Sequence, residues 1–170
     1  ERKPHIGTDI LIEVVERMRE EIIRLGGEFL FHSQVTDILP KENCLIVNGC
    51  HRIETDAAVF AVGHSARDTF QMLFDRNVAM KSKSLAIGVR AEHRQDMIDE
   101  AMYGRKERGP LGAAAYKLTA QLENGRGVYT FCMCPGGYVV NASSEQGRLA
   151  VNGMSYHDRA GENANSAVIV

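Results

Sequence analysis

Two cysteines in the second half of the chain are the residues whose type and spacing most directly suggest chemistry. Cys132 and Cys134 are separated by one residue, and on a regular strand this spacing places both side chains on one face. Two thiols on one face could form a redox pair, bind a metal ion or supply a nucleophile. They could also pack as small buried hydrophobic groups, which is the interpretation we favour because the spacing is weakly specific.

A metal site is the weakest of these alternatives. A structural zinc site normally needs four ligands, and no second Cys/His cluster in the chain has zinc-finger spacing. The other cysteines, Cys44 and Cys50, form no C-x-x-C pair either. We therefore predict no metal ligands, and we expect reduced thiols and a cytoplasmic location.

Two further groups could contact a small molecule. Gly136 and Gly137 follow the cysteine pair, and two glycines after a strand can form a backbone nest or admit a flat ring. Arg90 lies with Glu92 and His93 at the end of a predicted strand over residues 85–89. An arginine there could bind a carboxylate, although a surface ion pair of little energetic value is the simpler alternative.

The element that would position a site is the apolar stretch over residues 56–65. An acidic residue precedes six apolar ones, and the run stops at Gly63, His64 and Ser65. A short apolar run bounded by turn residues is typical of a strand buried on both faces, and open α/β sheets bind ligands at the carboxyl ends of such strands. We expect Ser65 or Asp68 to cap the following helix.

The rest of the sequence predicts a first helix, an antiparallel β-meander and a second half made largely of antiparallel strands. Thr8 or Asp9 should cap the first helix, which ends at Gly26 and Gly27. Carboxylates such as Asp96, Asp99 and Glu100 resemble a solvated helix face, and Asn163 and Asn165 resemble turn residues. The expected helices cover 9–25, 66–74 and 96–103, and the expected strands cover 29–31, 35–39, 44–47, 50–54, 56–62, 85–89, 113–121, 127–134, 138–142, 154–156 and 167–170.

Composition excludes several classes of function. The 170 residues are 44% hydrophobic and 25% charged, which is ordinary for a folded protein of one or two domains. A net charge of −2 gives no basic surface for nucleic acid. The sequence holds no signal peptide and no apolar run of bilayer length, so we expect neither a nucleic-acid nor a membrane partner.

Several long segments resemble a family of bacterial FAD-dependent proteins, described as NAD- or FAD-utilising dehydrogenases of unknown substrate. The resemblance covers essentially the whole chain. The segments that carry it are Pro4–Asp9, Leu25–Phe29, Ala61–Thr69, Phe131–Gly137, Ala150–Tyr156 and Asn163–Ala167.

The resemblance implies an α/β to α+β fold: a partial Rossmann-like FAD/NAD(P)-binding unit with a β-meander, plus a mainly antiparallel substrate domain with short helices. The corresponding divisions are residues 1–66, the substrate domain over 67–160, and a return strand over 161–170. It further implies an oxidoreductase that transfers hydride through FAD to or from a small-molecule substrate, with NAD(P)H as an electron donor.

The resemblance also assigns cofactor contacts. Val35 matches a position that contacts adenine, and Ala61, Val62, Gly63 and His64 match the end of a cofactor-facing strand. Gly63 lacks a Cβ that would hinder a ligand. His64 could donate to the flavin or phosphates, or could simply be a turn or cap residue. The weak catalytic candidates are His64, Arg90, Cys132 and Cys134.

One expected feature does not occur in the sequence. Such flavoproteins hold the FAD pyrophosphate with G-x-G-x-x-G, and residues 1–170 contain no such motif. The chain begins at Glu1 and ends in an apolar run, so we expect it to be a piece of a longer protein. The expected partner of this piece is the missing N-terminal part of the same protein. The alternative function is a non-catalytic substrate- or partner-binding module that does not hold FAD and is inactive alone.

Overall fold

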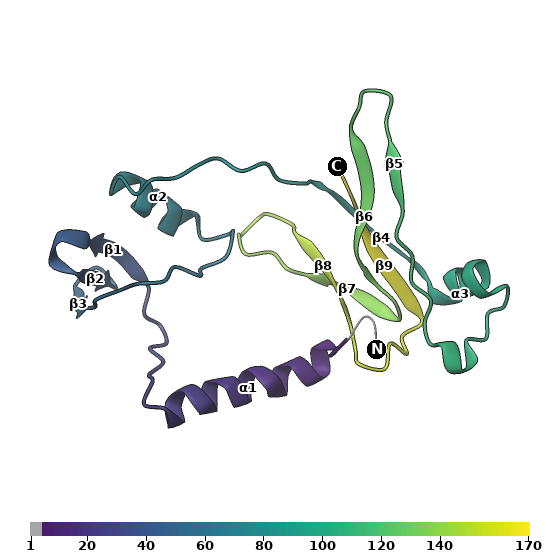
Figure 1. The fold of residues 1–170 in the computed structure, drawn as a ribbon, viewed down its shortest axis with the longest axis horizontal. Coiled ribbons are helices and arrows are strands. Elements are labelled where there is room, and N and C mark those ends of the chain that lie inside the picture. The colour runs from purple at the N-terminus through teal and green to yellow at the C-terminus, as the bar shows by residue number, and fades with distance from the viewer. Residues whose placement is uncertain (1–4) are drawn as a thin grey trace. The chain divides into compact units, whose positions relative to one another are not determined.

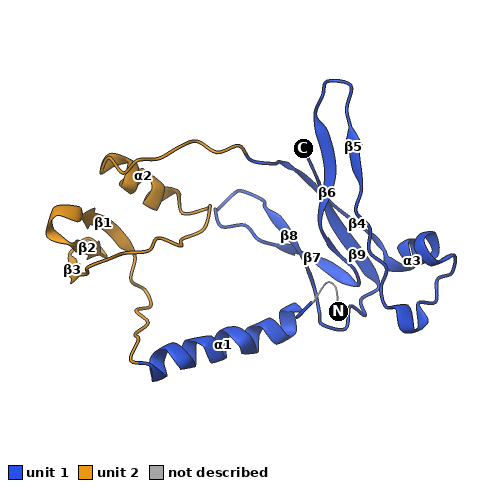
Figure 2. Ribbon diagram, in the orientation of Figure 1, with its two compact units in different colours: residues 1–25, 85–170 blue, residues 26–84 orange. Residues whose placement is uncertain are grey.

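Three antiparallel sheets and three α-helices make up the structure, a computed structural model that describes residues 5–170 (Figure 1). Pro4, which begins the first of the segments with family resemblance, lies outside the described residues. The chain divides into two compact units (Figure 2). Unit 1 contains the described residues up to Leu25 together with Leu85–Val170, and unit 2 is Gly26–Ser84. Within residues 5–170 the fold is therefore α+β, with every strand pairing antiparallel.

Unit 2 contains the predicted β-meander. Its strands pair in the order β1-β2-β3, and α2 packs on β1. The turn between β2 and β3 places Asn48 and Gly49 at φ 50° and 77°, the left-handed backbone that this residue pair adopts readily. The elements are β1 (Val35–Leu39), the 3-10 turn η1 (Pro40–Glu42), β2 (Cys44–Val47), β3 (His51–Glu54) and α2 (Arg67–Asp75).

The predicted buried strand over residues 56–62 is wrong for this structure. The segment is extended but belongs to no sheet, and Val59 is 93% exposed. A strand needs hydrogen-bonded neighbours, and in residues 5–170 no strand pairs with this backbone. The expected strand over 29–31 is absent from that range as well. The apolar composition of both segments was observed correctly, but composition supplies no pairing partner.

Unit 1 is built on the central strand β9, which pairs with β4 on one side and β6 on the other. The predicted strand over 127–134 has the expected bounds, whereas the strand predicted at 85–89 begins only at Gly88. The strands are β4 (Gly88–Arg94), β5 (Thr119–Gln121), β6 (Gly127–Cys134) and β9 (Asn163–Ile169) in one sheet, with β7 (Gly137–Asn141) and β8 (Val151–Ser155) in another.

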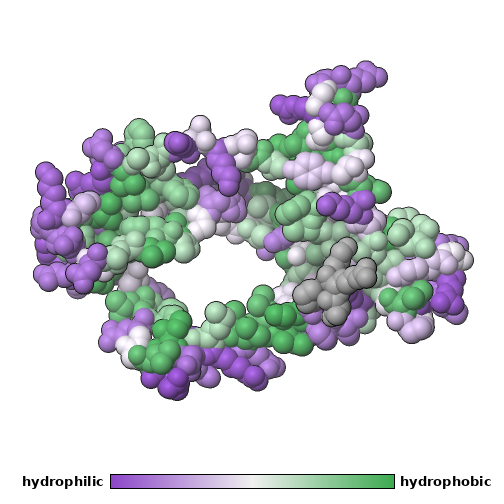
Figure 3. Space-filling view, in the orientation of Figure 1, coloured by the Kyte–Doolittle hydropathy of each residue, from purple (hydrophilic) through white to green (hydrophobic). Residues whose placement is uncertain are grey.

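The helices of unit 1 are α1 (Thr8–Arg24) and α3 (Gln95–Tyr103), with a 3-10 turn η2 (Gly109–Leu111) after α3. In Figure 3, apolar residues lie along one side of α1 and polar ones along the other. No residue of α1 is buried. No helix described in residues 5–170 is long and apolar enough to cross a bilayer.

The side chains predicted to cap α1 and α2 do not cap these helices. Gly7 precedes α1 and Ala66 precedes α2, and neither helix has a side-chain cap hydrogen bond. Asp9 instead accepts from the backbone N–H of His157 at 2.9 Å, and Asp68 accepts from Gln34. Both carboxylates therefore bind groups that are distant in the sequence, and not the N–H groups at the start of their own helices.

Exposure of the 56–62 segment gives a direct test. Val59→Asp should change the free energy of unfolding of the 170-residue chain by no more than about 0.5 kcal/mol, as an exposed substitution does. Val47→Asp is the matched control: Val47 is only 5% exposed in β2, so a charge there should cost several kcal/mol. Urea unfolding of both variants checks this, and strong destabilisation by Val59→Asp would contradict the exposed position.

Candidate functional site

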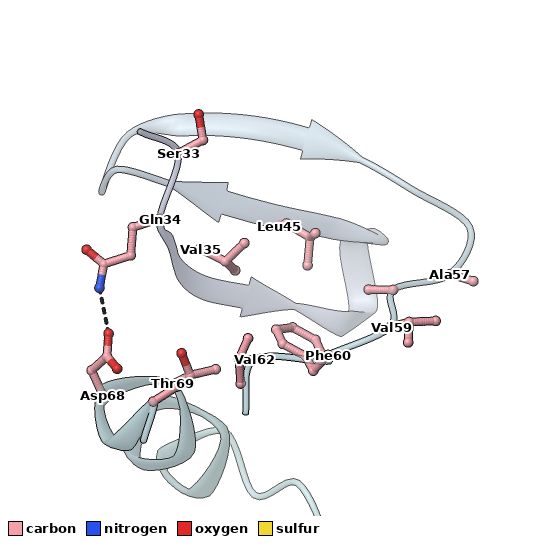
Figure 4. A pocket seen from close by; sticks show the side chains of 12 residues that line it. Ser33, Gln34, Val35, Leu45, Ala57, Val59, Phe60, Val62, Asp68 and Thr69 are labelled. Carbon is pink, nitrogen blue, oxygen red and sulfur yellow. Dashed lines mark hydrogen bonds between the residues drawn. The ribbon is translucent and has the colours of Figure 1, made fainter. Parts of the chain in front are cut away.

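Unit 2 contains an open pocket of about 420 Å³ between its sheet, the 57–62 segment and the first turn of α2 (Figure 4). One end is polar, because Gln34 Nε2 donates to Asp68 at 2.6 Å. The rest of the wall is mainly apolar, which suits a flat ring better than a charged group. The lining residues are Ser33, Gln34, Val35, Leu45, Ala57, Ala58, Val59, Phe60, Val62, Ala66, Asp68 and Thr69.

The structure brings together only two of the predicted cofactor contacts of unit 2. Val35 and Val62 both line the pocket, whereas Ala61, Gly63 and His64 do not. Gly63 has φ 74°, and a Cβ built on it would meet nothing within 4 Å. His64 is exposed, with Nε2 3.4 Å from Ser65 Oγ. The roles assigned to all five residues stay predictions.

In unit 1, polar residues gather on one face of the large sheet. Register pairs Arg90 with Ala167, and pairs Asn165 with both Glu92 and Cys134. Cross-strand partners point to the same face, so Arg90, Glu92, Cys134 and Asn165 share one. Strand β8 crosses above this face at Gly153, where an added Cβ would overlap side-chain atoms of Asn165, Arg90 and Cys134.

Arg90 is held on this face by neutral acceptors. Its Nη1 donates to Asn165 Oδ1 at 2.6 Å and to the Cys132 carbonyl at 3.1 Å. Its Nη2 lies 3.4 Å from Asn152 Oδ1. The surface ion pair considered from the sequence is not formed, since no carboxylate among residues 5–170 lies within ion-pair distance of Arg90.

Neighbours of Arg90 in the sequence have other partners. Glu92 accepts from Asn163 Nδ2 at 2.6 Å and from the Val139 N–H at 3.3 Å. His93 points to the opposite face, where its Nε2 is 2.7 Å from the Tyr116 hydroxyl. Burial raises the pKa of Tyr116 above its ordinary value. Arg90 and Glu92 therefore share a face without pairing with each other, and His93 belongs to the other face.

A β-bulge separates the two candidate cysteines. Strand β6 pairs regularly with β9 as far as Phe131 and resumes at Cys134, and Cys132 between them has φ 46°. A bulge breaks the alternation of side chains, so the prediction that both thiols share a face loses its basis. Cys132 is exposed and Cys134 half-buried, and both are free thiols.

The environment of Cys134 disfavours the thiolate. Burial raises the pKa of this thiol, and the opposing positive charges of Arg90 and Arg159 do not cancel that effect. A neutral thiol is a poor nucleophile and a poor metal ligand. Within residues 5–170 no group of three or more His, Cys, Asp or Glu side chains could hold a metal ion.

Gly136 lies in the turn between β6 and β7, Gly137 begins β7, and both are buried. Gly136 has φ 54°, and a Cβ on it would overlap the backbone of Arg159. A Cβ on Gly137 would likewise collide with the carbonyl oxygen of Met154. The Cα atoms of both glycines are thus covered by backbone of unit 1, which explains the need for glycine without a ligand. Their predicted contact with a cofactor stays a prediction.

A buried hydrogen-bond network fixes this turn. The N–H of Gly136 donates to Gln95 Oε1 at 2.8 Å, and Gln95 Nε2 donates to Asp99 Oδ1 at 2.9 Å. Asp99 also accepts from the Ala114 N–H at 2.8 Å and from Arg108 Nε at 2.6 Å. Gln95 and Asp99 are both 0% exposed. The prediction that Asp99 belongs to a solvated helix face is therefore wrong.

Burial acts to raise the pKa of Asp99, but hydrogen bonds from Ala114, Gln95 and Arg108 outweigh it and hold the pKa below the ordinary value. A carboxyl with a lowered folded-state pKa stabilises the fold above its unfolded pKa of about 3.9 and loses that contribution as pH falls. Asp99→Asn should be less stable than wild type near pH 7 and should lose less stability between about pH 5 and pH 3.

Thermal unfolding across this pH range measures the effect. Glu100→Gln, an exposed change on the same helix, is the matched control for the removal of one carboxylate. An Asp99→Asn variant that retains the wild-type slope would contradict the assigned role.

The close approach of β8 gives a second prediction. Gly153→Ala should destabilise the chain by about 1–3 kcal/mol, because the methyl group overpacks the layer beneath it. Gly127→Ala at the start of β6 is the control, since its Cβ would meet only Gln121 Oε1, at 3.9 Å. Guanidinium unfolding compares the two, and equal stability would show that β8 can move away without cost.

Sequence reasoning missed the residues that organise unit 1. Asn165 lies in a central strand and is 0% exposed, not in a turn. Gln95, Arg108, Asn152 and Gly153 received no role. The available signal was the spacing of Asn163 and Asn165, two residues apart and just before the apolar run that begins at Ala167, which fits a strand with polar residues on one face. Nothing in the local pattern of Gln95 or Arg108 could have shown which distant backbone they bind.

Comparison with known proteins gives two matches. The family model for "FAD-dependent protein, C-terminal domain-like" matches residues 84–170. A protein of Clostridium beijerinckii, described as an uncharacterized protein, is 54% identical over 175 residues that cover 100% of this chain and 33% of that protein. The chain thus spans about a third of the length of this relative.

Proposed function

The chain belongs to the family of FAD-dependent proteins whose C-terminal domain-like region matches residues 84–170, and we propose on that premise that it is part of an FAD-dependent oxidoreductase. In this proposal a small-molecule substrate exchanges a hydride with the flavin, and NAD(P)H is the electron donor. The observation that carries it is the family match, which coincides with the part of unit 1 that holds Arg90, Asn165 and Gly153.

The described residues fit only part of an FAD molecule. The apolar pocket lined by Val35 and Val62 can accept a flat ring such as adenine, and the Gln34–Asp68 pair supplies polar groups at its edge. A pyrophosphate needs clustered backbone N–H donors or cations, and the pocket lining contains no Lys or Arg. In this proposal the chain contacts one end of the cofactor, the adenine ring.

When bound, FAD supplies hydride acceptance or donation. The residues of this chain would act by binding and orientation. Arg90 would fix an anionic group of the substrate, and Gly153 would let β8 lie close against Arg90 and Asn165. The extended 57–62 segment would complete a Rossmann-like sheet with strands outside residues 5–170. The divisions proposed from the resemblance, residues 1–66, 67–160 and 161–170, belong to the same proposal, as does a cytoplasmic location.

A second candidate function rests on a specific observation. Residues 1–170 contain no G-x-G-x-x-G motif, so the chain by itself lacks the usual means of holding the pyrophosphate. The alternative is a non-catalytic module that binds a substrate or partner without flavin. This alternative describes the isolated chain, whereas the oxidoreductase describes the longer protein.

Flavin content separates the two. The complete protein should purify with a flavin absorbance spectrum, release FAD on denaturation and be reduced anaerobically by NADH or NADPH. The 170-residue chain titrated with FAD should bind it far more weakly. A complete protein that is colourless and acquires no flavin from added FAD would overturn the oxidoreductase proposal and favour the binding module.

A further inference from the structure

Arg90 is a half-buried cation whose partners are all neutral. Two carbonyl-type oxygens, from Asn165 and Cys132, accept from Nη1, and Asn152 offers Nη2 a long contact of 3.4 Å. Buried and half-buried arginines usually pair with a carboxylate, because uncompensated charge is costly to desolvate. Within residues 5–170 Arg90 has no such pair.

The geometry of the guanidinium divides it into an anchored edge and an available one. Nη1 is fixed by the sheet, and Nη2 makes only the long contact to Asn152. The guanidinium also interacts with the neutral thiol of Cys134. The Nε–Nη2 edge presents two parallel N–H groups that match the two oxygens of a carboxylate. Its neighbour Asn152 is exposed, so this edge lies at the accessible side of the layer.

Surrounding groups add positive charge without neutralising it. Arg159 is half-buried, and its Nε is buried without a hydrogen-bond partner in the described part of the chain. Its charge and that of Arg90 both act on Cys134, yet this thiol stays protonated because burial raises its pKa. The carboxylate on the same sheet face, Glu92, is already bound by Asn163 and the Val139 N–H.

We propose that Arg90, with Asn152 beside it and Arg159 nearby, forms a binding site for the carboxylate of a small organic acid. The anchored Nη1 holds the guanidinium plane in place, so little conformational freedom is lost on binding. As the substrate class of a redox enzyme this inference rests on the proposed function, whereas the binding itself requires no flavin.

A carboxylate suits this site better than a phosphate. A planar group with two oxygens is satisfied by one guanidinium edge. Phosphate sites are usually built from several backbone N–H groups at a helix N-terminus or nest, and the Arg90 edge lies on a strand between side chains. Inorganic phosphate therefore serves as the competing probe.

Calorimetric titration of the flavin-free 170-residue chain at constant ionic strength tests the site. Acetate, succinate and benzoate are the probes, acetamide, succinamide and benzamide their neutral controls, and inorganic phosphate the competing anion. At least one acid should bind saturably, its amide should not, and phosphate should bind more weakly. Arg90→Gln should lower the affinity for the acid by about tenfold or more, since charged hydrogen bonds are lost. Arg90→Lys should also lower this affinity, because lysine lacks the two parallel N–H groups of a guanidinium.

Asn152→Asp leaves Arg90 in place and so tests the site even if the Arg90 variants do not fold. Asn152 is exposed, and its Oδ1 also accepts from the Gly153 N–H at 2.8 Å, a contact that aspartate preserves. The new carboxylate would pair with Nη2 and should abolish binding of the acid while the thermal midpoint is retained. Arg126→Gln, in the exposed β5–β6 turn, should leave binding unchanged.

Three results would overturn the proposal: saturable binding by none of the acids, unchanged affinity in Asn152→Asp, or tighter binding of phosphate than of every acid. Each can occur whether or not the complete protein carries FAD. Conversely, a colourless complete protein would remove the redox role and leave the carboxylate site standing.

Discussion

The buried carboxylate of Asp99 is the constraint on which the organisation of unit 1 depends. A charge that is 0% exposed is tolerable only when every oxygen is hydrogen-bonded. The donors come from separate parts of the chain: Gln95 on the same helix, the Ala114 backbone, and Arg108. Arg108 also reaches the Arg159 carbonyl at 3.2 Å. Satisfying one carboxylate therefore ties α3, the following loop and the segment before β9 into one arrangement.

This network extends to the polar face through Gln95, which binds the N–H of Gly136. With the β6–β7 turn fixed, the β7–β8 hairpin crosses the large sheet at a defined place, and Gly153 allows its backbone to lie against Asn165 and Arg90. The bulge at Cys132 presents a carbonyl to Arg90. The orientation of the guanidinium thus follows from backbone packing that begins at a distant carboxylate.

The electrostatics of this layer favour binding an anion over thiol chemistry. The charges of two arginines act on Cys134, an arrangement that often activates a thiol, but desolvation has the larger effect and raises the pKa of the thiol. Positive charge is therefore available to a ligand and is not consumed by a thiolate. Unit 2 differs in kind, because its pocket is mainly apolar and lined by Val35 and Val62. The ligands proposed for the two units therefore differ, with a flat ring for unit 2 and a carboxylate for unit 1.

The sequence by itself determined the local elements: the amphipathic α1, the meander with its Asn48–Gly49 turn, and the strand over 127–134. Periodicity and turn chemistry act over a few residues, so one sequence suffices to detect them. It also singled out Arg90 and the possibility that it binds a carboxylate. Only tertiary structure decided that 56–62 lies outside any sheet, that Asp99 and Asn165 are buried, and that Arg90 has neutral partners. Those outcomes depend on which distant backbone satisfies each polar group, and local spacing carries no information about that choice.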